Sequence, residues 1–268
     1  MSKIASSDVR NFSYVELMAF LNETNRPPGG KDSIRRIVQN CFITKDSKVL
    51  DVGCNTGYCS FEIAHLAKCS VTGVDINKDM IGTAKKNQSK DASKSLLKFI
   101  LADGMKLPFE KEAFDVVMSG GSTAFIEDKM KAIHEYKRVL KQWGFIADIN
   151  FFYKTKPPKK LIEKLNTTMG INIEPWSIDY WLNLYKRCGL ERYYVYKGKI
   201  KKVINKEVQN YCSIMVGQKG LDKTSGKELC GRLGDIMNLF NRNHNYLDYG
   251  VFILRKRSKE EQISLFGA

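Results

Sequence analysis

The chain contains 268 residues, of which 43% are hydrophobic and 27% are charged. This composition is too apolar for a disordered protein, and the length predicts one large domain or one domain with an elaboration. The sequence lacks the roughly 20 uninterrupted apolar residues that a membrane span requires. It also begins without the apolar stretch of a signal peptide. We therefore expect a soluble, cytoplasmic protein with no membrane partner.

The charge is basic and unevenly distributed. The 44 Lys and Arg residues exceed the 29 Asp and Glu residues, which gives a formal net charge of +15. Residues 151–268 carry 22 of the basic residues but only 11 of the acidic ones. Such an excess either attracts anionic partners or keeps the protein soluble, and the sequence leaves both open.

The number of cysteines is odd, and no two of them have the C-x-x-C spacing of a zinc or redox motif. The three histidines lie far from any group of cysteines, so no metal site is predicted. We expect reduced thiols that are mostly buried. The seven cysteines are Cys41, Cys54, Cys59, Cys69, Cys188, Cys212 and Cys230.

In chain order, the pattern first predicts a helix over 13–22, a turn-rich break over 25–33 and a helix over 33–42. Short runs rich in Val, Ile and Phe then alternate with longer amphipathic runs as far as residue 150. The strands predicted there are 48–53, 70–75, 97–103, 114–119 and 145–150. The helices predicted between them are 55–67, 78–90 and 128–141.

The second half begins with a hinge rich in Pro and Lys at 154–160. The elements predicted after it are helices at 159–167 and 177–188, a strand at 192–199, a helical segment over 203–243 that breaks at 217–226, and a strand at 248–256. Regular alternation of strand and helix before residue 150 predicts a parallel sheet with right-handed crossovers. Ligands of such sheets bind at the carboxyl ends of the strands.

The stretch VLDVGCNTGY, residues 49–58, is the clearest candidate for a binding turn. It predicts a strand carrying Asp51, followed by a turn from Gly53 to Gly57 that leads into a helix. Glycines allow the backbone of such a turn to approach a ligand closely. The spacing is G-x-x-x-G rather than G-x-G-x-x-G, and no P-loop Lys follows, so a phosphate-binding loop is not favoured.

This stretch resembles the first motif of the class I S-adenosylmethionine-dependent methyltransferases, roughly D-x-G-x-G-x-G. Asn55 stands where the middle glycine is usual, and Asn tolerates positive φ better than most residues. The resemblance continues over residues 47–150, because Asp75 and Asp103 end the second and third predicted strands as acidic residues do in the family. FDVVMS matches the fourth strand, and EYKRVLKQWGF is similar to the family turn R-V-L-K-P-G-G.

The resemblance implies a cofactor, S-adenosyl-L-methionine, and a role for each matched residue. Asp75 would bind the two ribose hydroxyls and Asp103 the adenine amino group, while Ile76 would lie against the adenine. A single Asp at a strand end is more often a helix cap or turn residue than a ligand, and only the joint spacing of Asp51, Asp75 and Asp103 favours binding. The implied cofactor-binding residues are Asp51, Gly53, Cys54, Asn55, Gly57, Asp75, Ile76, Asp103, Gly104 and Ser119.

The implied fold is α/β: a Rossmann-like, seven-stranded, mostly parallel sheet with helices on both faces, an N-terminal helical lid and a helical insert before the last strand. We expect the lid at 1–46, the methyltransferase core at 47–199, the cap insert at 200–247, and the final strand and tail at 248–268.

The loop SGGSTAF, residues 119–125, favours a small-molecule acceptor. It lacks both the [D/N]PPY motif of enzymes that methylate amines of nucleic acids and the Pro-Cys of cytosine-C5 enzymes. No catalytic base can be assigned: His134 is expected at the surface, and His244 is the better candidate but is by default a loop histidine. Arg26 is either a contact of the cofactor carboxylate or a solvated loop residue. Six residues are possible pocket walls, although each taken singly is more typical of a core stripe: Tyr14, Phe20, Tyr211, Met215, Met237 and Phe240.

Two other functions remain open. Lys and Tyr interleave in FFYKTKPPKK and YYVYKGKIKK, and this pattern with the basic second half suits an RNA or DNA methyltransferase. A methyltransferase fold used only to bind a partner is the other alternative, and the intact cofactor turn argues against it. Residues 262–266, QISLF, are similar to the motif by which bacterial proteins bind the sliding clamp, or they pack on their own domain.

Overall fold

The computed structural model describes residues 12–21, 23, 26–170 and 172–257. The chain divides into two compact units. Unit 1 consists of Met1–Thr24, Phe152–Trp176 and Lys199–Asp248, and unit 2 consists of Asn25–Phe151, Ser177–Gly198 and Tyr249–Ala268. The predicted clamp-binding segment, residues 262–266, lies outside the described residues.

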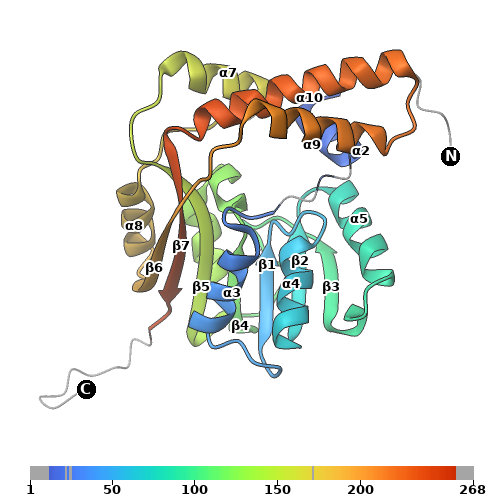
Figure 1. The fold of residues 1–268 in the computed structure, drawn as a ribbon. Coiled ribbons are helices and arrows are strands. Elements are labelled where there is room, and N and C mark those ends of the chain that lie inside the picture. The colour runs from blue at the N-terminus through green and yellow to red at the C-terminus, as the bar shows by residue number, and fades with distance from the viewer. Residues whose placement is uncertain (1–11, 22, 24–25, 171, 258–268) are drawn as a thin grey trace, which may run out of the picture. The chain divides into compact units, whose positions relative to one another are not determined.

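A seven-stranded sheet with the order β3-β2-β1-β4-β5-β7-β6 forms the centre of unit 2. Its strands are β1 (Lys48–Val52), β2 (Ser70–Asp75), β3 (Leu97–Leu101), β4 (Phe114–Ser119), β5 (Leu140–Tyr153), β6 (Glu191–Lys199) and β7 (Leu247–Arg255). The strands β1 to β5 pair in parallel, whereas β7 runs opposite to β1 in Figure 1, so the sheet is mixed. Consecutive residues of β1 and β4 are buried, which requires cover on both faces.

Helices provide that cover, and α3 and α4 lie in front of the sheet in Figure 1. The helices of unit 2 are α3 (Gly30–Asn40), α4 (Tyr58–Ala67), α5 (Lys78–Ser89), α6 (Lys129–Val139) and α8 (Ile178–Arg187), with the 3-10 turns η1 (Lys94–Leu96) and η2 (Ser122–Phe125). The side chains of Asn77, Asp128 and Ser177 accept backbone N–H bonds at the starts of α5, α6 and α8. The seven-stranded α/β fold predicted from the sequence is confirmed.

Unit 1 has a core of its own. Its helices are α2 (Tyr14–Leu21), α7 (Lys159–Met169), α9 (Asn205–Gly217) and α10 (Lys223–Asn243). Leu17 and Leu21 of α2 are buried together with residues of α9 and α10, such as Cys212 and Leu233. The N-terminal helix and the helical insert therefore share one apolar core, although almost 200 residues separate them in the sequence.

The predicted ends of two elements were wrong at the junction of α6 and β5. The strand predicted at 145–150 begins at Leu140, and the helix predicted to end at 141 ends at Val139. Leu140 pairs with Phe114, and a register shift then leads to the pairing of Phe145 with Val116. This irregularity absorbs the turn-like residues before Phe145, so the strand continues through them.

The remaining global predictions concern thiols, membranes and metals. All seven cysteines lie in the described ranges and are free, and six of them are buried, as predicted. No described helix is both long and apolar enough to cross a membrane. Nor do the described ranges hold three or more His, Cys, Asp or Glu side chains grouped to bind a metal ion.

Candidate functional site

The turn between β1 and α4 is built on positive φ angles. Gly53 has φ +70°, Asn55 has φ +51° and Gly57 has φ +95°. The backbone N–H groups of Gly53 and Cys54 both donate to the carbonyl of Val74, at 2.8 and 2.9 Å, which anchors the turn to β2. A Cβ at Gly53 would lie 2.1 Å from Ser122 Oγ, so only glycine fits there.

Asp75 ends β2 beside this turn. Its Oδ2 accepts the backbone N–H of Asn55 at 2.8 Å, and its Oδ1 accepts that of Asn77 at 2.9 Å. The carboxylate is half-buried, and each oxygen has a further lone pair available. Asp75 is thus held in one orientation by two backbone groups and can still accept hydrogen bonds from a ligand.

Asp51, on β1, is fully buried below the same turn. Ser60 donates to its Oδ2 at 2.6 Å, whereas no described group donates to its Oδ1. Burial raises the pKa of Asp51 to about 6, and the hydrogen bond from Ser60 opposes that shift. A buried carboxyl with one oxygen that accepts no hydrogen bond therefore lies next to the turn.

Asp103 and Gly104 follow β3, next to the end of β2. The backbone N–H of Met105 donates to Asp103 Oδ1 at 2.8 Å, which fixes this half-buried carboxylate. A Cβ at Gly104 would lie 3.0 Å from Val52 Cγ1, so the backbone passes close to β1 here. Ile76, after β2, is 71% exposed and available to a flat apolar ligand.

The loop after β4 is joined to the turn after β1 through two hydroxyl groups. Ser122 Oγ donates to the carbonyl of Val52 at 2.6 Å and lies 2.8 Å from Ser119 Oγ. Ser119 Oγ also accepts the backbone N–H of Thr123 at 3.1 Å. The ends of β1 and β4 thus form one hydrogen-bonded edge.

The residues before α3 lie against this edge. A Cβ at Gly120 would lie 3.6 Å from Pro27 Cβ, and one at Gly121 would lie 3.7 Å from Pro28 Cδ. The guanidinium carbon of Arg26 is 5.7 Å from the ring centre of Tyr58, the first residue of α4. The structure thus brings the Pro-Pro-Gly-Gly segment beside the candidate site.

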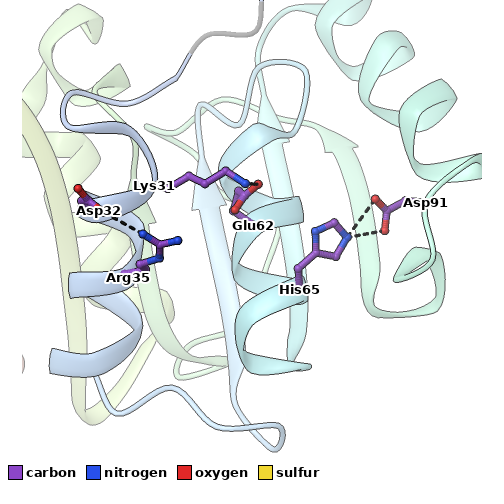
Figure 2. A network of polar contacts seen from close by, with 6 residues as sticks. All are labelled: Lys31, Asp32, Arg35, Glu62, His65 and Asp91. Atoms are coloured by element: carbon purple, nitrogen blue, oxygen red, sulfur yellow. Dashed lines mark hydrogen bonds and ion pairs between the residues drawn. The ribbon is translucent and has the colours of Figure 1, made fainter.

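Polar contacts link α3 to α4, and α4 to the residues that follow α5, as Figure 2 shows. Lys31 of α3 pairs with Glu62 of α4 at 2.8 Å. The Nε2 atom of His65 on α4 contacts both carboxylate oxygens of Asp91, which follows α5, at 2.9 and 3.1 Å. One side chain of each pair is exposed to solvent, so the pairs add little stability. We assign these residues no part in ligand binding.

The remaining predicted residues belong to other elements, most of them in unit 1. His134 is exposed on α6, and His244 follows α10 in unit 1. All six possible pocket walls, from Tyr14 to Phe240, pack as partly buried residues against the apolar core of unit 1.

Sequence reasoning missed a buried polar cluster on β5. Asp148 and Asn150 are 1% and 0% exposed, and Tyr185 of α8 donates to Asp148 Oδ2 at 2.9 Å. Asn150 Nδ2 donates to the Tyr185 hydroxyl at 3.2 Å. The available signal was the i, i+2 spacing of two polar residues in the otherwise apolar run FIADINFF.

Comparisons with known proteins agree with this arrangement. Residues 50–147 match the family model of a methyltransferase domain. An uncharacterized protein of Haemophilus influenzae is 28% identical over 185 residues, which are 68% of this chain and 74% of that protein. Demethylmenaquinone methyltransferase of Staphylococcus aureus is 31% identical over 46% of this chain, and sterol 24-C-methyltransferase of Gibberella zeae is 30% identical over 58%. The matched residues cover 51% and 42% of the lengths of these two enzymes.

Solved structures share the fold. The crystal structure of MccD protein has a TM-score of 0.77 at 26% identity and is matched over 87% of this chain and 100% of that chain. Phosphoethanolamine N-methyltransferase 2 of Haemonchus contortus, in complex with S-adenosyl-L-methionine, has a TM-score of 0.70 at 15% identity, over 96% of this chain and 61% of that chain. The domain match, the relatives and the seven-stranded fold together show a methyltransferase domain over residues 50–147, within a chain that has the fold of class I, S-adenosylmethionine-dependent methyltransferases.

Proposed function

We propose that the chain transfers a methyl group to a small-molecule acceptor and binds its cofactor at the edge formed by the turn after β1 and the ends of β2, β3 and β4. The observation that carries this proposal is the orientation of Asp75. Two backbone N–H groups fix its carboxylate in one orientation. A carboxylate that accepts hydrogen bonds from both hydroxyls of a ribose needs such a fixed orientation.

The residues present suit S-adenosylmethionine on physical grounds. Gly53 and Gly57 hold positive φ angles, and glycines in such a turn allow its backbone to approach a ligand closely. The turn leads into the N-terminus of α4, which favours the carboxylate of the methionine part. The Oδ1 atom of Asp51 remains without a donor, as expected of a site that a ligand or ordered water completes.

In this proposal each residue of the edge has one task. Asp75 accepts the ribose hydroxyls, Asp103 accepts the adenine amino group and Ile76 lies against the adenine, while Cys54, Asn55 and Gly57 shape the turn. Gly104 lets the backbone approach, and Ser119 lies near the reacting methyl group. The bound cofactor supplies a methyl group on a positively charged sulfur, and the protein positions the acceptor in line with it.

Two observations support a small acceptor. The loop after β4 has no [D/N]PPY or Pro-Cys motif. In addition, the named relatives act on demethylmenaquinone and a sterol, according to their names. We further propose that the protein acts in the cytoplasm, with residues 1–46 as a lid, 47–199 as the core, 200–247 as a cap and 248–268 as the final strand and tail.

Calorimetry and a cofactor-consumption assay test the proposal together. Titration of S-adenosylhomocysteine into the full chain should give saturable binding, and a metabolite panel should reveal an acceptor that accelerates cofactor consumption. Absence of S-adenosylhomocysteine binding would contradict the proposed cofactor site. Tight binding of short RNA or DNA that weakens steeply with salt would instead favour the nucleic-acid alternative.

The tail carries a separate proposal, that residues 262–266 bind a bacterial sliding clamp. A synthetic peptide of residues 258–268 should bind the clamp with a micromolar Kd, which corresponds to roughly −8 kcal/mol. The change Phe266→Ala should abolish this binding. A peptide that fails to bind at high micromolar clamp would overturn the clamp proposal and leave the enzymatic one intact.

A further inference from the structure

The segment that leads into α9 exposes two neighbouring aliphatic side chains. Residues 199–206, KIKKVINK, comprise the last residue of β6, a short connection and the first two residues of α9, and we call them the lysine segment. All of them belong to unit 1. Val203 is 37% exposed and Ile204 is 63% exposed. The fold thus leaves an aliphatic pair in water, where a partner outside the chain can bury it.

The backbone polar groups of this pair already have partners within the protein. Asn241 of α10 accepts the N–H of Val203 through Oδ1 at 3.3 Å and donates from Nδ2 to the carbonyl of Val203 at 2.5 Å. The N–H of Ile204 donates to Glu207 Oε2 at 2.9 Å. The carbonyl of Ile204 accepts the N–H groups of Glu207 and Val208, at 2.9 and 3.2 Å. None of these four backbone groups therefore needs water.

Such internal pairing decides which surroundings the pair can enter. An N–H or C=O group that leaves water for an apolar medium without a partner is destabilising, so a segment that enters such a medium must satisfy its own backbone. Connecting segments usually avoid this problem by staying in water. Val203 and Ile204 can leave water without losing a backbone hydrogen bond, which makes them suited to an apolar medium.

The charges next to the pair are positive. The lysine segment carries four lysines, all exposed, and the nearest acidic residue in the sequence is Glu207. None of the four lysines forms an ion pair with an acidic side chain in the part of the chain that the structure describes. They are Lys199, Lys201, Lys202 and Lys206. An aliphatic pair flanked by unpaired lysines fits a partner that is apolar inside and anionic at its surface.

We propose that the lysine segment binds the surface of a membrane that contains anionic lipids. Val203 and Ile204 enter the boundary between headgroups and acyl chains, and the lysines contact the anionic headgroups. Nucleic acid also attracts lysines, but aliphatic side chains offer no ring on which a base can stack. Binding of this kind needs no membrane span, so it revises the expectation of no membrane partner, which rested on the missing span. It is independent of the proposed cofactor site.

Flotation of the full chain with lipid vesicles tests the proposal. Vesicles of phosphatidylcholine and phosphatidylserine in equal amounts should bind the chain. Vesicles of phosphatidylcholine alone should bind it more than about tenfold more weakly, because each lysine near an anionic surface strengthens binding about fivefold. Added salt should weaken binding to the mixed vesicles, because it screens the lysines. Equal binding to both kinds of vesicle, or binding to neither, would overturn the proposal.

A variant of the aliphatic pair locates the contact. Ile204→Ala should weaken binding to the mixed vesicles about tenfold, because less apolar surface enters the acyl boundary. The side chain is exposed, so the change leaves the core of unit 1 intact. Leu66→Ala shortens an exposed aliphatic side chain on α4, in unit 2, and is the matched control. It should bind as the parent protein does.

A double variant tests the charges. Lys201→Gln with Lys202→Gln should weaken binding to the mixed vesicles about twentyfold. Lys85→Gln with Lys86→Gln removes two adjacent exposed lysines of α5 and should leave binding unchanged. Parent-like vesicle binding by both lysine-segment variants would exclude this segment as the contact. Binding of short RNA that the Lys201 and Lys202 changes abolish, without any vesicle binding, would replace the membrane by nucleic acid.

Discussion

The Oδ2 atom of Asp75 accepts the backbone N–H of Asn55 across 2.8 Å, so that the end of β2 and the turn after β1 are directly joined. Asn55 is the residue of the turn that departs from the family pattern, and its φ is +51°. The hydrogen bond stabilises the turn in the form in which the glycines on either side, Gly53 and Gly57, hold positive φ angles. Asp75 therefore shapes the site in addition to any contact it makes with the cofactor.

The first prediction concerns this carboxylate. Asp75→Ala should weaken S-adenosylhomocysteine binding by about 1.5–3 kcal/mol, because a charge-assisted acceptor is lost. Calorimetry at constant pH measures the change. Asp79→Ala, at an exposed position in the first turn of α5, provides the control and should bind as the parent protein does. Unchanged affinity in Asp75→Ala would remove Asp75 from the binding site.

The second prediction compares two glycines. Gly53→Ala should destabilise the protein by about 1–3 kcal/mol, because φ is +70° and the new Cβ would meet Ser122 Oγ, which is held by Val52. Gly82→Ala, within α5 and facing open space, should stabilise it by about 0.5–1 kcal/mol. Urea unfolding measures both. Opposite signs are expected, and equal effects would contradict the packing described at Gly53.

The third prediction concerns pH. Burial raises the pKa of Asp51 and that of Asp148 from 3.8 to about 6. The folded state therefore binds more protons than the unfolded state between about pH 4 and 6, and each group lowers stability as pH rises through that window. For each of these fully buried groups, the total decrease in the free energy of unfolding approaches about 3 kcal/mol.

Urea unfolding of the cofactor-free protein at pH 5 and at pH 7 tests this dependence. The parent protein should be more stable at pH 5, and Asp148→Asn should reduce the difference between the two values. A variant that retains the full difference would show that Asp148 does not titrate in this range.

The fourth prediction concerns thiol reactivity. Burial raises the pKa values of the Cys54 and Cys59 thiols, so few thiolates form near the cofactor turn. Cys230 is only partly buried and should react first with a disulfide reagent in the native protein. Cys230→Ser should remove the fast phase, whereas Cys59→Ser should leave it. Loss of the fast phase in Cys59→Ser would contradict the burial seen here.

Patterns along the chain predicted the strands that carry the cofactor motif, because their apolar runs are short and end in aspartate or serine. They failed where tertiary pairing decides the conformation. Trp143 has a φ of +64° and lies within β5, although the residues around it resemble a family turn. Gly30 begins α3 three residues before the predicted start, after Gly29, whose missing side chain leaves room for Tyr249 of β7. The pairing of β5 decides the conformation of Trp143, and the ring of Tyr249 decides that of Gly29. The local sequence indicates neither of them.

The edge that carries Asp75 and Asp103 was predictable, because each of these two residues follows a short apolar run in the sequence. The cluster around Asp148 was not, because it depends on a hydrogen bond with Tyr185, a residue 37 positions later on a different helix. A polar residue in a buried strand gives no indication of which helix will cover it. Only the packed structure joins the two.

The strand order has a consequence for the time at which the protein can fold during synthesis. β7, the last described strand, lies between β5 and β6, and β6 has no other neighbour in the sheet. While the ribosome is still adding residues before Leu247, the backbone groups of Glu191–Lys199 have no strand to pair with. The helix Tyr14–Leu21 likewise waits for partners that emerge late. A nascent chain therefore exposes both segments until these later partners have been synthesised, and holdase chaperones that bind apolar segments should recognise it during that interval.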